Sequence, residues 1–132
     1  MAFEYNRDDK RRLEIVFGPG ATCDYKTGGT ESFVELTIDE LKILLDEGFI
    51  DPDGRYNEAP TTMDFYAFME RHPDITAHGY LVSPGRDDYR MVIDGLDYLG
   101  DPSREFIIDF LDTFKDADEI FMDEDGLYCW YG

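Results

Sequence analysis

Apolar positions along this chain follow two periods, one typical of strands and one typical of helices. Strand-like runs rich in β-branched and aromatic side chains cover residues 13–17, 32–36, 75–82, 89–96, 119–122 and 127–130. Gly18-Pro19-Gly20 ends the first of these runs, and residues 21–31 read as a loop or a hairpin turn. We expect residues 1–12, which are polar and mixed in charge, to form an N-terminal lead-in.

Helical spacing appears in three segments. Thr37 and Glu40 form a capping box ahead of the first helix, and Gly48 suits its left-handed end. The second helix begins at residues 60–62, and it ends by His72 because the following proline disfavours helical backbone.

The third helix begins after residue 100. Asp101 is expected as its N-cap, and Pro102 then occupies the first helical position, where a missing N–H costs nothing. Apolar residues at helical spacing predict its buried face, and they are Phe106, Ile107, Phe110, Leu111 and Phe114.

The resulting order of elements is ββααββαββ, with turns at residues 83–88 and 123–126 joining the later strands into hairpins. Such an order predicts an α+β fold, specifically a two-layer sandwich with a largely antiparallel sheet and about three helices. With 132 residues and no linker, the chain is expected to form a single domain over residues 1–132.

The charge of the chain narrows the choice of partners. A net charge of −19 repels nucleic acid and anionic membranes and attracts basic proteins. An aromatic content of 15% argues against disorder, which usually combines high charge with few aromatics. Since the chain opens without an apolar signal-peptide core, and no apolar run approaches the roughly 20 residues that span a bilayer, we expect a cytoplasmic protein.

The negative charge is concentrated late in the sequence. Residues 97–125 contain eleven acidic residues and two basic ones, so this stretch carries a net −9. Five of the acids step by three or four residues through the third predicted helix, and they are Asp101, Glu105, Asp109, Asp112 and Asp116. This spacing predicts a ridge of carboxylates on the side opposite the apolar face.

The ridge favours an interaction protein that binds a basic partner by electrostatic complementarity. The partner would be a nucleic-acid-binding protein or a nuclease, and the chain would act as a nucleic-acid mimic, an inhibitor or an immunity-type protein. Two alternatives remain open at this point. In the first, the acidity is an adaptation to high salt. In the second, the function lies in a small-ligand site or active site on the hairpin that turns at residues 83–88, formed by His78, Tyr80, Arg86 and Arg90.

Catalytic and cofactor motifs are missing from the sequence. His72 and His78 have no second histidine at metal-binding spacing, so we expect neither a metal nor another cofactor. Cys23 and Cys129 are expected to be reduced thiols, with a disulfide between them as the alternative. The sequence therefore favours a protein that is not an enzyme.

Overall fold

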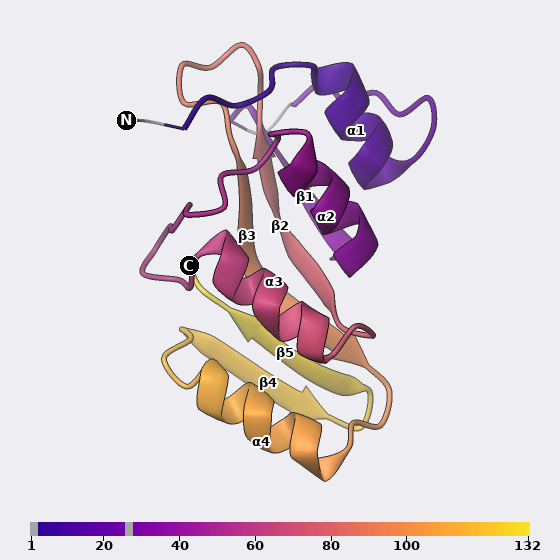
Figure 1. Ribbon diagram of the computed structural model, residues 1–132, viewed down its shortest axis with the longest axis vertical. Coiled ribbons are helices and arrows are strands. Elements are labelled where there is room, and N and C mark those ends of the chain that lie inside the picture. The colour runs from indigo at the N-terminus through magenta and orange to yellow at the C-terminus, as the bar shows by residue number, and fades with distance from the viewer. Residues whose placement is uncertain (1–2, 26–27) are drawn as a thin grey trace.

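The computed structural model describes residues 3–25 and 28–132, which form four helices and one five-stranded sheet (Figure 1). Every strand pairs antiparallel with its neighbours, in the order β1-β2-β3-β5-β4. The α+β class and the antiparallel sheet are thus confirmed, whereas the helix count is four instead of about three. The two-layer sandwich remains a prediction.

The elements follow the chain in the order αβααββαββ. Their bounds are α1 (Asp9–Phe17), β1 (Thr30–Leu36), α2 (Ile38–Asp46), α3 (Thr62–Arg71), β2 (Thr76–Val82), β3 (Met91–Leu99), α4 (Arg104–Thr113), β4 (Glu119–Asp123) and β5 (Gly126–Trp130). Five of the six expected strands and all three expected helices are present. The loop expected over residues 21–31 includes residues 26 and 27, which lie outside the described residues.

The strand expected at residues 13–17 is wrong, because this stretch forms the second half of helix α1. Asp8 caps the helix by accepting a hydrogen bond from the N–H of Arg11 at 3.2 Å, so the supposed polar lead-in supplies the first turn. A short apolar run does not by itself distinguish a strand from a buried helix segment. Here the capped, polar first turn outweighs the strand propensity of Ile15 and Val16.

Helix α1 also buries a charge, the guanidinium of Arg12. It donates hydrogen bonds to the carbonyl oxygens of Val82 and Arg90, to Asp9 and to the hydroxyl of Tyr25, at 2.8–3.1 Å. A buried charge is tolerated when its hydrogen bonds are satisfied in this way. Arg12 therefore joins α1 to the β2–β3 hairpin.

The starts of α2 and α3 agree with the sequence. Thr37 accepts from the N–H of Glu40, whose carboxylate accepts from the N–H of Thr37 in return. Thr61 and Asp64 form the same reciprocal pair at the start of α3. Gly48 follows α2 with a φ of +80°, the left-handed conformation that glycine adopts without strain.

The predicted start of α4 is wrong by two residues. Ser103, not Asp101, is the N-cap, and its Oγ accepts from the N–H of Phe106 at 3.2 Å. Serine and aspartate cap helices about equally well, so the sequence does not choose between them. Asp101 consequently precedes the helix, and Asp116 follows its last residue, Thr113.

One apolar cluster receives side chains from all four helices and from strands β1, β2, β3 and β5. Leu13, Leu44, Phe68 and Phe110 represent the four helices in this cluster. Strand β3 lies at the centre of the sheet and is buried along its first half. Figure 1 places α4, β4 and β5 together at the end of the molecule opposite the turn that joins β2 to β3.

Candidate functional site

Helix α4 is held in place by a column of phenylalanines. Phe106, Phe110 and Phe114 are buried at four-residue steps, and each ring contacts Phe68 of α3 with centroids 4.9–5.9 Å apart. Because residues four apart share one helix face, the acids between them are directed away from this column. The packing of α4 therefore determines which of its carboxylates are exposed to solvent.

Glu105 and Asp112 are both exposed on α4, and neither forms an ion pair among the described residues. Asp101 is exposed ahead of the helix. Asp116 is exposed behind it and accepts a hydrogen bond from the hydroxyl of Tyr131 at 2.8 Å. The five predicted acids thus extend along one region of the chain, but the helix itself carries three of them.

Asp109 differs from the other four acids of the predicted ridge. His72 donates to its carboxylate at 2.7 Å, and Arg71 pairs with it at 3.2 Å. Thr113 also donates a hydrogen bond to this carboxylate. Partial burial acts to raise the pKa of Asp109, but the hydrogen bonds from Arg71 and His72 outweigh it and hold the pKa below its usual value. Asp109 therefore joins α4 to the end of α3.

We define the acidic end as residues 97–125, at the bottom of Figure 1. Nine of its eleven acids are exposed and have no cation within 4 Å among the described residues. They are Asp101, Glu105, Asp112, Asp116, Asp118, Glu119, Asp123, Glu124 and Asp125. The other 103 residues carry a net −10, so this quarter of the chain holds nearly half of the total charge.

In the β2–β3 hairpin, which supplies the alternative site, the positive charges are balanced by an acid of the same hairpin. Arg86 and Arg90 both pair with the carboxylate of Asp88, at 2.7 and 2.8 Å. Arg90 also donates to the hydroxyl of Tyr80 at 3.3 Å and lies over the ring of Tyr56. The structure therefore brings Tyr80 and Arg90 together, with both arginines already engaged by an acid of the same hairpin.

His78 belongs to a different cluster from the arginines. Its imidazole donates to Asp94 at 2.8 Å, contacts the carbonyl oxygen of Cys129 at 3.1 Å and stacks on Tyr128. Burial alone would lower the pKa of His78, but the hydrogen bond to Asp94 and the charges of Asp97 and Asp94 raise it. This cluster was not predictable from the sequence, because Asp94 and Tyr128 reach His78 only through strand pairing.

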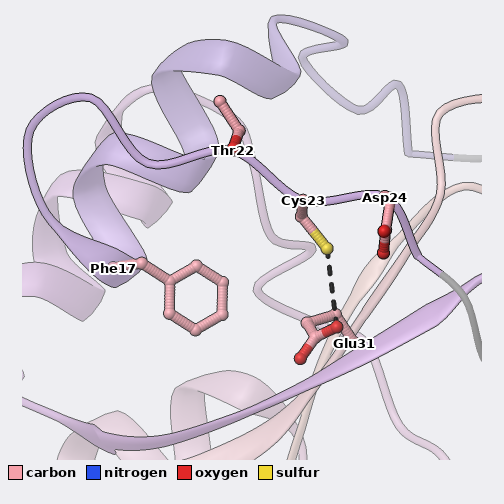
Figure 2. A pocket seen from close by; sticks show the side chains of 5 residues that line it. All are labelled: Phe17, Thr22, Cys23, Asp24 and Glu31. Atoms are coloured by element: carbon pink, nitrogen blue, oxygen red, sulfur yellow. Dashed lines mark hydrogen bonds between the residues drawn. The ribbon is translucent and has the colours of Figure 1, made fainter.

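Figure 2 shows a hollow near the end of α1, lined by Phe17, Thr22, Cys23, Asp24 and Glu31. The thiol of Cys23 donates to Glu31 at 3.5 Å, and partial burial raises its pKa. Burial also raises the pKa of Cys129, to about 12. Both thiols are free, and their raised pKa values favour the protonated form, which is a poor nucleophile.

Edge strand β4 carries an exposed apolar segment that was not predicted from the sequence. Ile120, Phe121 and Met122 are consecutive, and their exposed fractions are 36%, 56% and 56%. Three apolar residues in a row break the alternation of a strand with one buried face, and this break was the available signal. Two further apolar side chains, Ile108 and Leu111 of α4, are also exposed.

Comparison with protein-family models, with curated proteins and with solved structures finds no match to this chain. No helix in the described part of the chain is long and apolar enough to cross a membrane. Within the same residues, no group of three or more His, Cys, Asp or Glu side chains is arranged to hold a metal ion. The candidate site is therefore defined by its own geometry and charge.

Proposed function

We propose that this protein binds a basic protein through its acidic end, as a nucleic-acid mimic, an inhibitor or an immunity-type protein. The nine exposed carboxylates without a cation partner carry this proposal. An exposed charge that makes no internal ion pair keeps its field for an approaching partner, which accelerates encounter and favours complementary surfaces.

Glu105 and Asp112 are the proposed centre of the contact on α4. They lie two helical turns apart, about 10 Å along the axis, and nothing described on α4 neutralises them. Asp109 is not placed at the centre of the contact, because its carboxylate already pairs with Arg71 and His72. Its replacement would disturb the α3–α4 contact as well as the binding of a partner.

The proposal is tested by reversing Glu105 and Asp112 to lysine in one variant. Binding is measured by fluorescence anisotropy against two basic proteins, core histones, which bind DNA, and egg-white lysozyme, which does not. We expect the affinity of the wild-type protein for histones to fall steeply with salt. The double variant should lose at least about ten-fold in affinity, equivalent to about 1.4 kcal/mol.

The matched control is a variant with Glu4→Lys and Asp87→Lys. Both acids are exposed and lie outside the acidic end, so the net charge changes equally while that end stays intact. This control should bind within about three-fold of wild type. Equal weakening by both variants, or no histone binding at low salt, would contradict the proposal. Preference for histones over lysozyme, with competition by duplex DNA, supports mimicry over plain neutralisation.

A further inference from the structure

Strand β4 is an open edge of the sheet. It pairs with β5 over five regular positions, from Glu119↔Trp130 to Asp123↔Gly126, and forms the end of the strand order. Outside the regular helices and strands, the backbone hydrogen bonds of the described residues include none from residues 119–123. Half of its backbone N–H and C=O groups therefore face outward, where they are able to pair with another strand.

The two edges of the sheet differ in how well they are protected against the addition of another strand. Strand β1, at the other end of the sheet, has an irregular register between Phe33 and Leu36, and Glu35 there has a φ of +57°. Such a bulge discourages an added strand. Strand β4 pairs without a register shift, and all five of its side chains are exposed. Only the edge at the acidic end combines a regular backbone with exposed apolar side chains.

The charges around β4 indicate which kind of segment would suit this edge. If a second copy paired antiparallel about Phe121, Glu119 would lie opposite Asp123 of the other copy at both ends of the ladder. Like charges directly opposite each other destabilise a strand pair, and each chain carries −19. A segment with apolar residues in its middle and basic residues at its ends matches the same edge without this repulsion.

We propose that an extended segment of the basic partner adds to β4 as a sixth strand. This inference rests on the proposed function and assigns it a mode of contact. Alternate apolar side chains of the added segment meet Phe121 on one face and Ile120 and Met122 on the other, since side chains alternate between faces. Lysine or arginine at its ends lies near the acids at and next to the two ends of β4, which are Asp118, Glu119, Asp123, Glu124 and Asp125.

The probe is a synthetic peptide of alternating valines and threonines with two lysines at each end. Its control is the same peptide with methyl groups on alternate backbone nitrogens, on the side that would pair. The two peptides share charge and side chains and differ in their backbone donors. We expect the unmodified peptide to bind in a titration followed by NMR and to protect amides of residues 119–123 from exchange. The methylated peptide should bind at least five-fold more weakly.

The matched protein variants are neutral, so electrostatic attraction is unchanged. Phe121→Thr with Met122→Thr removes apolar surface from β4, and the β-branched threonines retain strand propensity. Val34→Thr makes the same kind of change on β1, at a side chain that is 66% exposed. The β4 variant should bind the peptide at least five-fold more weakly than wild type, and Val34→Thr within two-fold.

The outcomes separate this inference from the proposed function. The strand-addition inference is overturned if both peptides bind equally and the β4 variant binds as well as wild type. The proposed function stands in that case, provided that histone binding still depends on Glu105 and Asp112. If neither histones nor peptide binds, both are overturned. A wild-type dimer by analytical ultracentrifugation that the β4 variant abolishes would show a second copy at this edge and overturn the choice of partner.

Discussion

At the scale of single residues, two buried basic side chains connect elements that are distant in the sequence. Arg12 joins α1 to the β2–β3 hairpin through two of its four hydrogen bonds, those to the carbonyl oxygens of Val82 and Arg90. His78 joins β2, β3 and β5 through Asp94, Asp97 and the carbonyl oxygen of Cys129. Asp9 and Asp94 therefore have basic partners inside the fold.

The raised pKa of His78 predicts how stability varies with pH. Below the ordinary value of 6.5, the imidazole is protonated in the folded and the unfolded chain, so its stabilisation by Asp94 and Asp97 is present in full. As the pH rises through the raised folded pKa, that stabilisation is lost. Urea unfolding should therefore show a free energy of unfolding that falls as the pH rises above the ordinary value of 6.5.

The control for this pH dependence is a pair of variants at His78 and Asp94. His78→Gln should flatten the profile, and Asp94→Asn, which keeps the imidazole but removes its charged partner, should reduce the fall. NMR titration of the His78 ring gives its pKa directly, and Asp94→Asn should lower that pKa. A His78 that titrates below 6.5 in the wild-type protein would contradict the argument.

At the scale of elements, capping decides where each helix begins. The reciprocal caps of α2 and α3 are evident in the sequence, because a threonine precedes an acid by three residues in each case. For α4, Asp101 and Ser103 compete for the same position. The serine caps the helix, and this choice removes Asp101 from α4.

Alanine replacements of Ser103 and Asp101 distinguish the two starts of α4. Ser103→Ala removes the acceptor for the N–H of Phe106 and should cost about 1 kcal/mol in the free energy of unfolding. Asp101→Ala should change it by less than about 0.5 kcal/mol, as usual for a surface substitution. Urea denaturation of both variants measures the difference, and a larger effect at Asp101 would restore the start expected from the sequence.

At the scale of the whole molecule, the charge is divided unevenly. The acidic end holds a net −9 in 29 residues, and the other 103 residues hold −10. Most described ion pairs lie outside this end, for example Arg11–Glu47 and Arg86–Asp88. The repulsion among unpaired carboxylates is therefore strongest where binding is proposed, and a basic partner would relieve it.

This repulsion predicts a dependence of stability on salt. The Debye length shrinks from about 30 Å at 0.01 M to about 3 Å at 1 M, so added sodium chloride should screen the carboxylates and raise the midpoint of urea unfolding. We expect the protein to be folded at both extremes, as judged by circular dichroism. Unfolding at 0.01 M salt would instead favour the alternative that the acidity is an adaptation to high salt.

The amino-acid sequence by itself determined most of the local structure and all of the charge. Capping residues, hydrophobic periods and turn residues act over three or four positions, which is why α2, α3 and the two later hairpins were predictable. The exception is residues 13–17, whose β-branched residues favour a strand that their capped first turn and buried surroundings override.

Tertiary structure alone decided which side chains meet. Strand pairing brings Asp94 and Tyr128 to His78, and packing of α3 against α4 places Arg71 and His72 on Asp109. The strand order leaves β4 at an open edge, although its residues resemble those of a paired strand. These outcomes depend on contacts between residues far apart in the chain, and no local pattern encodes such contacts.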